Sequence, residues 1–472
     1  MLGLDLCFFD ATELVCLLRT SEISSREVVA AHIAQVERVN PAVNAIVTFV
    51  PELAIKAAAA ADERLIRGEA LGPLHGIPVA HKDLHDTAGI RTTYGSPIFA
   101  DYVPAADSVA VARIKAAGGI TIGKTNTPEF GLGSQTFNPV FGATRNPYDL
   151  SKTCGGSSGG AAVALACGMV PLADGSDMGG SLRNPANFNN IVGFRCSPGR
   201  MPGAAVSWAT LSVDGPMART VDDVALLLSV MAGPDTASPI SISEPGEKFR
   251  APLERDFRGT RIAWSSDFGG VPIDPEVVRV LESQRHVFSD LGCEVDESCP
   301  DLSDAYEAFQ TLRAAGLAES RGQLLAEHRH QLKDTAVWNI EKGLALTGGE
   351  LARAGRLRTA VFNTMKAFMD RYEFLVLPVN QVAPFSIDTE YPTEINGVAM
   401  ETYIDWMKSC YYITMTGHPA ISVPCGFTDD GLPVGVQIVG RYREESAVLQ
   451  LAKAFESATR VGRRRPRVAL TP

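Results

Sequence analysis

The chain has 472 residues, of which 45% are hydrophobic and 21% charged, and this balance excludes a disordered chain and predicts a globular protein with a large core. Its formal net charge of −11, from 43 basic and 54 acidic residues, argues against a broad surface for nucleic acids. The one basic cluster, RVGRRRPR at 460–467, is interpreted as a solvated tail, with a contact to RNA or to a protein partner as the alternative.

The N-terminal residues and the cysteines bear on where the protein works. No apolar run reaches the roughly 18 residues of a membrane helix, and the start MLGLDLCFFD lacks the basic residues and the cleavage site of a signal peptide. The nine cysteines form no C-x-x-C pair and no group with histidines at zinc-ligand spacing, which favours small buried side chains in a reducing compartment. We predict a cytoplasmic protein that contacts neither a membrane nor nucleic acid and needs no metal or other cofactor, with a homodimer left open.

The first third of the chain predicts helices followed by alternating strands and helices. Residues 24–40 predict a helix because Ser24 and Glu27 form a capping-box pattern ahead of apolar residues at helical spacing. Residues 52–68 predict a second helix. The next expected elements, in chain order, are a buried strand at 76–83, a helix at 107–119, a strand at 120–126, a helix at 159–169, a strand at 170–177 and a helix start at 181–187.

The second half continues this alternation after a Pro/Ser-rich surface crossing at 234–257. The expected elements are a strand at 261–266, an almost wholly helical excursion at 303–372, strands at 374–378, 420–426 and 434–440, and a last helix at 445–460. Strands alternating with helices predict an α/β fold, with a mixed central sheet covered by helices on both faces. We expect a single domain over 1–472, made of N-terminal helices (1–70), a core that carries the chemistry (76–233), a variable, partly helical region (234–416) and C-terminal strands with a helix (417–472).

The stretch CGGSSGG at 154–160 is the first candidate for chemistry. It contains GGSSG, which matches the G-x-S-x-G nucleophile elbow and would make Ser157 the attacking residue of an α/β-hydrolase. Such an enzyme needs a downstream histidine, and only His418 lies in a suitable loop, where a structural, hydrogen-bonded histidine is the simpler interpretation. The stretch lacks the lysine of a phosphate-binding P-loop, which disfavours a nucleotide site.

A second serine follows paired glycines in DMGGSLRNP at 177–185. Successive backbone N–H groups between a strand end and a helix start can hold a developing oxyanion, and Ser181 would present its hydroxyl beside them. The alternative is that Ser181 is only a helix N-cap. A serine nucleophile needs a base, and Lys82, on the opposite strand face from His81, becomes one if burial lowers its pKa. An ion pair between Lys82 and Asp83 or another carboxylate is the competing interpretation.

Four segments together resemble one known family. They are GGSSGGAAVALACGMVPLADGSDMGGSLRNPANFNNIVGFRCSPGR (155–200), GIPVAHKDLHDTAGIRTTYGS (76–96), GKTNTPEFG (123–131) and GHPAISVPCG…GLPVGVQIVG (417–440). The first is similar to the defining serine- and glycine-rich block of the amidase signature family, the second to its lysine segment, and the others to its following loop and C-terminal strands. The resemblance extends over nearly the whole chain.

The resemblance implies amide hydrolysis by a Ser–cis-Ser–Lys triad through an acyl-enzyme. Ser181 matches the nucleophile, Ser157 the bridging serine in a cis peptide, and Lys82 the general base. The remaining matches are the oxyanion-hole and substrate-binding residues Met178, Gly179, Gly180, Ser181 and Gly131, and the supporting residues Ser158, Asp177 and Arg183. For Arg183 a purely structural salt bridge is at least as good an interpretation as a direct role.

The expected activity is hydrolysis of a small or aryl amide, an anilide or a carbamate by the free-standing chain. The alternative is the glutaminase subunit of a tRNA-dependent amidotransferase complex. Arg358 would serve the carboxylate of glutamine there, but an exposed helix arginine is the simpler interpretation of this residue. Cys154, Cys196, His81 and the segment LPVNQVAPF (377–385) depart from the common family pattern, and they leave the substrate preference open. We expect 303–416 to shape the substrate pocket, because it is the part least like a fixed motif.

Overall fold

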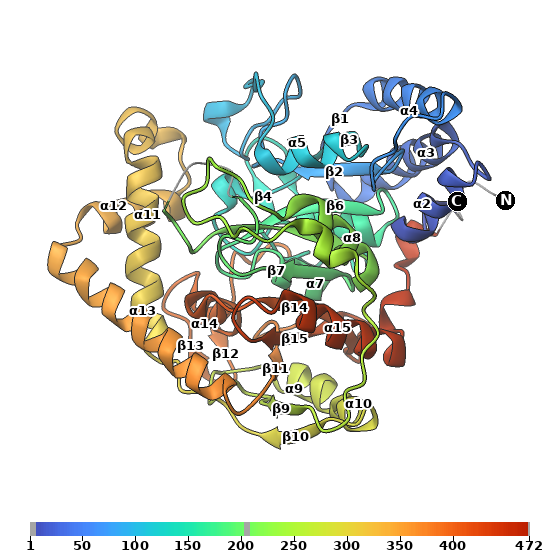
Figure 1. The fold of residues 1–472 in the computed structure, drawn as a ribbon. Helices are drawn as coiled ribbons and strands as arrows, with labels where there is room; N and C mark the ends of the chain where they lie inside the picture. Colours follow the sequence, from blue (N-terminus) through green and yellow to red (C-terminus); the bar gives the residue numbers. More distant parts are fainter. Residues whose placement is uncertain (1–5, 203–207, 471–472) are drawn as a thin grey trace.

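The computed structural model describes residues 6–202 and 208–470, and an 11-stranded sheet forms its centre (Figure 1). In order across the sheet the strands are β1 (Ile46–Phe49), β3 (Ile120–Thr125), β2 (Pro78–Lys82), β6 (Leu172–Asp177), β8 (Val213–Ala218), β7 (Val192–Arg195), β14 (Ala420–Phe427), β15 (Pro433–Gly440), β11 (Phe374–Pro378), β9 (Arg261–Trp264) and β10 (Glu294–Glu297). The sheet thus combines strands from the beginning, middle and end of the chain.

Parallel and antiparallel pairs both occur in this sheet. The neighbours β3, β2 and β6 run parallel, as do β11, β9 and β10 at the far end. Every pair between β6 and β11 is antiparallel, and so is the edge pair β1 and β3. The predicted mixed sheet is confirmed.

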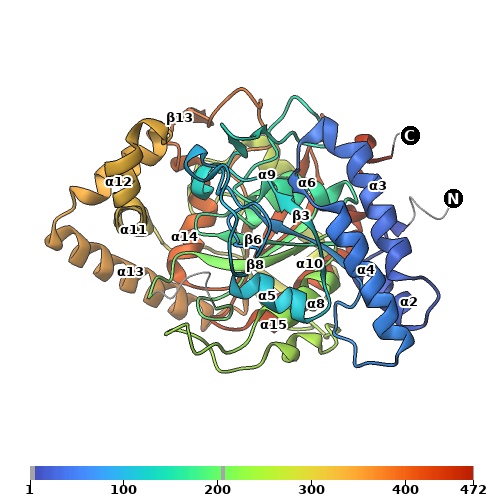
Figure 2. The same ribbon diagram turned by 90° about the horizontal axis from the view of Figure 1, so that it is seen from above.

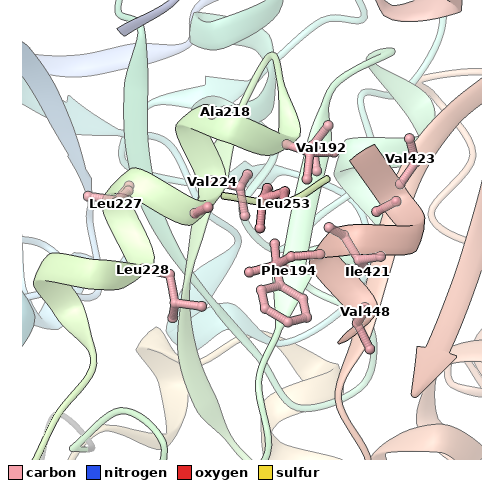
Figure 3. Packing of buried hydrophobic residues seen from close by; sticks show 14 of the residues in the cluster. Val192, Phe194, Ala218, Val224, Leu227, Leu228, Leu253, Ile421, Val423 and Val448 are labelled. Atoms are coloured by element: carbon pink, nitrogen blue, oxygen red, sulfur yellow. The ribbon is translucent and has the colours of Figure 1, made fainter. Parts of the chain in front are cut away.

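Helices cover both faces of the sheet. The helices outside the 303–372 excursion are α2 (Ala11–Arg19), α3 (Ser25–Val43), α4 (Pro51–Ile66), α5 (Val109–Ala116), α6 (Gly159–Ala166), α7 (Arg183–Phe188), α8 (Val221–Met231), α9 (Pro275–Glu282), α10 (Arg285–Asp290), α14 (Lys408–Thr416) and α15 (Glu445–Thr459). Consecutive residues of β2, Val79 and Ala80, belong to different hydrophobic clusters, because alternate side chains of a strand point to opposite faces. Val79 belongs to the cluster that also contains residues of α8 and α15, part of which is drawn in Figure 3, whereas Ala80 belongs to the cluster with residues of α3 and α6.

The predicted helical excursion is confirmed as three helices, α11 (Ala305–His328), α12 (Asp334–Leu344) and α13 (Gly348–Met369). They stand together at one side of the molecule in both ribbon views (Figures 1 and 2). Buried residues of α11 and α13 form a third hydrophobic cluster with α14 and with Leu375 and Leu377 of β11. This cluster fixes α11 next to the carboxyl end of β6.

Local sequence signals explain where two of these helices begin. The Ser24 hydroxyl accepts a hydrogen bond from the Glu27 N–H, and the Glu27 carboxylate accepts one from the Ser24 N–H at 2.8 Å, so the predicted capping box starts α3. Helix α6 begins at glycines because it approaches other backbone closely. A Cβ on Gly160 would lie 2.3 Å from the Asn126 nitrogen. Gly160 is therefore required for this close packing.

The arginines of the basic segment 460–467 are solvent-exposed, as the sequence predicts, but the segment is packed and is not a free tail. Arg463 forms an ion pair with Asp10, and the guanidinium groups of Arg464 and Arg465 lie over the rings of Phe427 and Phe8. These contacts hold the segment against the body of the protein. Among the described residues, no helix is both long and apolar enough to cross a bilayer.

Candidate active site

The predicted site residues meet at one edge of the sheet. Lys82 is the last residue of β2 and Asp177 the last of β6, and these strands are parallel neighbours, so both end at the same edge. Ser157 lies just before α6, and Ser181 lies in the loop between β6 and α7. The carboxyl ends of parallel strands are where ligands commonly bind in α/β sheets.

The amine of Lys82 is enclosed by three hydroxyl groups. Its Nζ lies 2.7 Å from Ser157 Oγ, 2.9 Å from Ser158 Oγ and 3.0 Å from Ser176 Oγ. The side chain is fully buried, and no carboxylate of the described residues forms an ion pair with it. The competing interpretation, a pair with Asp83, is wrong, because the Asp83 carboxylate accepts hydrogen bonds from the backbone and hydroxyl of Thr93 instead.

Burial lowers the pKa of Lys82 from 10.5 to about 7, against the opposing attraction of Asp214, Asp177 and Asp174. Near neutral pH a large share of the amine is therefore uncharged and able to accept a proton. His81, the preceding residue, points to the other face of β2, as the strand alternation predicts, and its Nδ1 bonds Asp174 at 2.5 Å.

A buried network around Asp174 fixes the backbone of Lys82, and sequence reasoning missed it. The Asp174 carboxylate accepts hydrogen bonds from the Lys82 N–H at 2.8 Å, from His81 and, at 2.7 Å, from His85. Burial opposes protonation of His85, but the attraction of Asp174 and Asp214 outweighs it and raises the pKa of His85 to about 10. The alternation of β6 is the signal that could have found this network, since Asp174 and Ser176 share one face of that strand.

The peptide bond between Gly156 and Ser157 is cis, as the resemblance implies. Two side chains hold this turn by its carbonyls: Ser134 donates to the Gly156 oxygen at 2.7 Å, and Thr136 donates to the Gly155 oxygen at 2.8 Å. The turn directs the Ser157 hydroxyl to Lys82.

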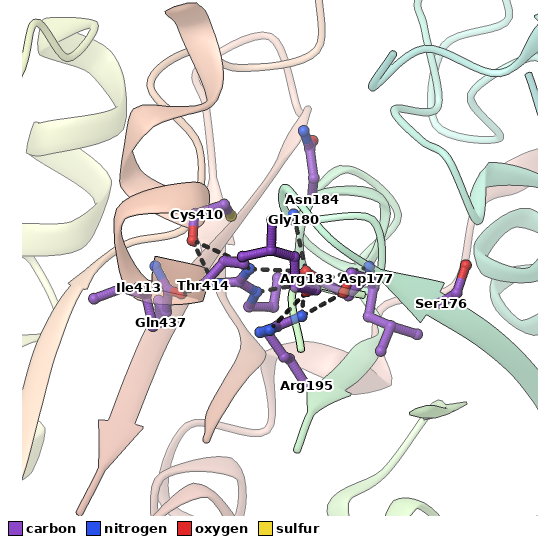
Figure 4. A network of polar contacts seen from close by, with 12 residues as sticks. Ser176, Asp177, Gly180, Arg183, Asn184, Arg195, Cys410, Ile413, Thr414 and Gln437 are labelled. Carbon is purple, nitrogen blue, oxygen red and sulfur yellow. Dashed lines mark hydrogen bonds and ion pairs between the residues drawn. The ribbon is translucent and has the colours of Figure 1, made fainter. Parts of the chain in front are cut away.

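Asp177 and Arg183 form the support of the Ser181 loop (Figure 4). The guanidinium of Arg183 binds the Asp177 carboxylate through two hydrogen bonds of 3.0 and 2.9 Å, and it also donates to Gln437 at 2.7 Å. Arg195 donates to the Asp177 carbonyl oxygen on the other side. Arg183 and Asp177 are fully buried, so the interpretation of Arg183 as a structural ion pair fits its contacts.

The Asp177 carboxylate also binds two backbone N–H groups, those of Gly180 at 3.0 Å and Leu182 at 3.1 Å. The predicted role of the Gly180 N–H as an oxyanion donor is therefore not supported, because this group already donates to Asp177. The N–H groups of Met178, Gly179 and Ser181 have no hydrogen-bond partner among the described residues. They remain available to a ligand.

Ser157 and Ser181 line the same cavity, which has a volume of about 120 Å³. Its other lining residues are Leu84, Phe130, Gly131, Leu132, Gly133, Ser176, Met178, Gly179, Ser212, Phe309, Arg313, Leu317 and Met407. Four of these come from 303–416, the region expected to shape the pocket.

His418 and Arg358 are not among the lining residues. His418 is a buried histidine that bonds the Thr416 carbonyl at 3.0 Å, which fits the structural interpretation.

Comparisons with known proteins identify the family. The family model described as Amidase matches residues 27–449. The chain belongs to the amidase signature family. An acylamidase from Rhodococcus erythropolis is 37% identical over 461 residues, which cover 96% of this chain and 96% of that protein. The structure of a bacterial aryl acylamidase of this family superposes with a TM-score of 0.88 at 32% identity, covering 96% of each chain. A glutamyl-tRNA(Gln) amidotransferase subunit from Moorella thermoacetica is 34% identical, covering 99% of this chain and 100% of that protein.

Like other amidase signature proteins, this chain is an amide-hydrolysing enzyme. No group of three or more His, Cys, Asp or Glu side chains in the described part of the chain could hold a metal ion. The candidate active site is therefore the cavity lined by Ser157 and Ser181, next to the Lys82 amine.

Gly131, which lies in the cavity wall, permits the observed position of Ser157. A Cβ added at Gly131 would lie 3.2 Å from Ser157 Oγ and 2.9 Å from Leu84 Cδ1. We expect Gly131→Ala to lower kcat/KM by about tenfold or more, because Ser157 must move away from Lys82. Steady-state kinetics on an anilide would measure this loss.

Gly133→Ala is the matched control. Gly133 also lines the cavity with a positive φ, but its added Cβ would meet only Lys333 Nζ, at 3.9 Å. Alanine at a positive φ lowers the free energy of unfolding by about 1 kcal/mol in both variants, and thermal unfolding would measure this loss. Equal losses of activity in the two variants would contradict the role given to Gly131.

Proposed function

We propose that the enzyme hydrolyses small or aryl amides, anilides or carbamates through a Ser181–Ser157–Lys82 relay. The observation that carries this proposal is the buried amine of Lys82, which forms no ion pair with a carboxylate of the described residues. It lies 2.7 Å from the Oγ of Ser157, and Ser157 and Ser181 line the same cavity. Such an amine is a base near neutral pH, and a hydroxyl in contact with it can pass a proton on.

The proposed reaction begins when neutral Lys82 accepts the proton of Ser157. Ser157 in turn takes the proton of Ser181, whose oxygen attacks the amide carbonyl. The Ser181 hydroxyl has no hydrogen-bond partner among the described residues, so it is free to turn toward Ser157 or the substrate. The N–H groups of Met178, Gly179 and Ser181 then stabilise the oxyanion.

The tetrahedral intermediate collapses when the carbon–nitrogen bond breaks. The proton held by Lys82 returns through Ser157 to the leaving amine, and the acyl group stays on Ser181. Water then attacks the acyl-enzyme along the same proton path and releases the carboxylic acid. Ser158 and Ser176 keep the Lys82 amine in place through their hydroxyl groups.

The substrate class rests on the similar acylamidases and on the cavity. The acylamidase relative and the aryl acylamidase structure each match this chain over 96% of its length. Apolar side chains of Leu84, Phe130, Leu132, Phe309 and Leu317 line the cavity and suit an alkyl or aryl group. A free-standing amidase is therefore the function favoured here.

A second candidate is the glutaminase subunit of an amidotransferase complex. The 34% identity to the glutamyl-tRNA(Gln) amidotransferase subunit of Moorella thermoacetica, over the full length of that protein, supports it. Arg358, the candidate ligand for the carboxylate of glutamine, lies half-buried on α13 and does not line the cavity that contains Ser181. This position gives the second candidate less support.

One experiment separates the two candidates. The purified chain is assayed alone with 4-nitroacetanilide and with glutamine, and proteins that copurify with the chain from its native cells are identified. Anilide hydrolysis by the isolated chain supports the amidase. Glutamine hydrolysis that requires two copurifying proteins, without anilide hydrolysis, would replace it with the glutaminase of a complex.

The pH dependence of kcat/KM follows from the pKa of Lys82. Because only the neutral amine accepts a proton, we expect activity to rise with pH and to reach half of its plateau near pH 7. His85, with a pKa of about 10, stays protonated across this range, so it adds no step near pH 7. Initial rates from pH 5.5 to 9 on a neutral anilide give the profile. A flat profile between pH 6 and 8 would contradict Lys82 as the base.

A further inference from the structure

Helix α11 provides one wall of the cavity through three residues, Phe309, Arg313 and Leu317. They are spaced four residues apart, so they lie on one face of the helix. Phe309 is next to the Ser181 loop, since a Cβ on Gly179 would lie 3.4 Å from Phe309 Cζ. Arg313 follows one helical turn later, about 6 Å further along the axis.

Arg313 is buried, with 5% of its surface exposed, and its hydrogen-bond partners are neutral. It donates to the Asn339 side-chain oxygen and, at 2.7 Å, to the Tyr403 hydroxyl, and its guanidinium lies over the Tyr403 ring. Among the described residues, no carboxylate forms an ion pair with it. Two lysines lie near, Lys333 and Lys342, whose pKa values are lowered first by burial and also by repulsion from Arg313. The carboxylates that act on these lysines, Glu129 and Glu390 on Lys333 and Asp405 on Lys342, form no ion pair with Arg313.

The other buried arginines of the described chain are all paired with a carboxylate. Arg183 and Arg195 contact Asp177, and Arg200 contacts Glu445. A buried charge without a counter-ion is costly, and a guanidinium has further N–H donors in a planar array that matches a carboxylate. Arg313 is thus a buried cation in the reaction cavity that lacks its counter-ion.

We propose that Arg313 binds a carboxylate of the substrate, so that the preferred substrates are amides that carry this group about one helical turn from the scissile carbonyl. The proposal rests on the proposed function, because it assigns the substrate class of the same cavity. The carboxylate belongs either to the acyl part or to the amine part of the substrate. In both cases Arg313 would bind it through the same charged hydrogen bonds.

Two matched pairs of substrates test the proposal. Glutaranilic acid and its methyl-ketone analogue 5-oxohexananilide differ in charge on the acyl side, and 4-acetamidobenzoate and 4-acetamidoacetophenone differ on the amine side. We expect the carboxylate to be preferred in one pair by about ten- to a hundredfold in kcat/KM, as a charged hydrogen-bonded pair provides. In Arg313→Gln this ratio falls to within threefold, while Arg313→Lys keeps part of it.

Lys342→Gln is the matched control, because it removes a positive charge from the same neighbourhood at a residue that does not line the cavity. It should keep the carboxylate preference. A wild-type preference for the neutral member of both pairs, or an unchanged ratio in Arg313→Gln, overturns the proposal. Thermal unfolding of each variant shows whether the loss of the Asn339 and Tyr403 contacts has affected the fold. If Arg313→Gln is unfolded, Arg313→Lys takes its place in the test. A carboxylate preference equal to that of the wild type in a folded Arg313→Lys then also overturns the proposal.

A failure of the proposed function gives a different result. In that case the wild-type protein hydrolyses none of the four compounds. The carboxylate preference is then measured by calorimetry, as the ratio of Kd values within each pair on Ser181→Ala and on Ser181→Ala with Arg313→Gln. Tighter binding of one carboxylate by at least tenfold, lost with Arg313→Gln, supports the role of Arg313 independently of turnover, and equal binding overturns it.

Discussion

Ser181→Ala is expected to lose amide hydrolysis by at least about 10⁴-fold, because the proposed acyl-enzyme has no oxygen on which to form. The Ser181 hydroxyl lines the cavity and has no hydrogen-bond partner among the described residues, so its removal leaves no buried polar group unpaired. The midpoint of thermal unfolding should therefore stay within a few degrees of the wild-type value. Release of 4-nitroaniline measures the first effect and circular dichroism the second.

A fluorophosphonate probe identifies the attacking serine directly. We expect mass spectrometry of the labelled wild-type protein to place the adduct on Ser181, and Ser181→Ala to remain unlabelled. An adduct on Ser157 would return the nucleophile-elbow interpretation of CGGSSGG. Hydrolysis by Ser181→Ala above one hundredth of the wild-type rate would also exclude Ser181 as the nucleophile.

Local patterns in the sequence predicted most strands of the sheet, but not β8 and β7 at its centre or β1 and β10 at its edges. The capping box of α3 and the buried run that forms β2 are signals within one segment. In contrast, β8 contains Gly215 and Pro216, residues that usually argue against a central strand. Its residues are buried on both faces, so the sequence shows no alternation of polar and apolar residues that would predict a strand. The segment is a strand because it pairs with β6 and β7.

The candidate site shows the same division. Ser157 and Ser181 stand in glycine motifs, and both were found from the sequence alone. Asp174 and Ser176 lie in an ordinary-looking strand, and they matter because β6 places them beside Lys82. Arg313 could not be found from the sequence, since an arginine on a charged helix is usually exposed, and only the folded chain shows it without a carboxylate in the cavity.

The Gly180 N–H illustrates a limit of motif transfer. The glycine pair predicted a row of donors facing one point, yet the Asp177 carboxylate accepts the hydrogen bond of the second glycine. Which N–H groups face the cavity depends on the direction of each peptide plane. That direction is set here by the buried pair of Asp177 and Arg183, which the residue spacing cannot reveal.

The relay itself is tested by removing its base and its bridge. We expect Lys82→Met, which keeps an apolar side chain of similar length, and Ser157→Ala each to lower kcat by about 10²- to 10⁴-fold, the usual contribution of a positioned base. Ser176→Ala is the control for the contacts of the amine, since Ser176 also binds Lys82 Nζ, at 3.0 Å, but has no place in the proton path. Its loss should be below tenfold.

The double variant decides whether Lys82 and Ser157 act as one unit. If the proton of Ser181 reaches Lys82 only through Ser157, removing the second member costs little once the first is gone. We therefore expect Lys82→Met/Ser157→Ala to retain kcat within about threefold of the poorer single variant. Two independent contributions would instead multiply, to roughly 10⁴- to 10⁸-fold. Because the 2.7 Å contact between Lys82 Nζ and Ser157 Oγ is the geometric basis of the relay, a multiplicative loss would mean that this contact positions the turn and that Ser181 gives its proton to another group.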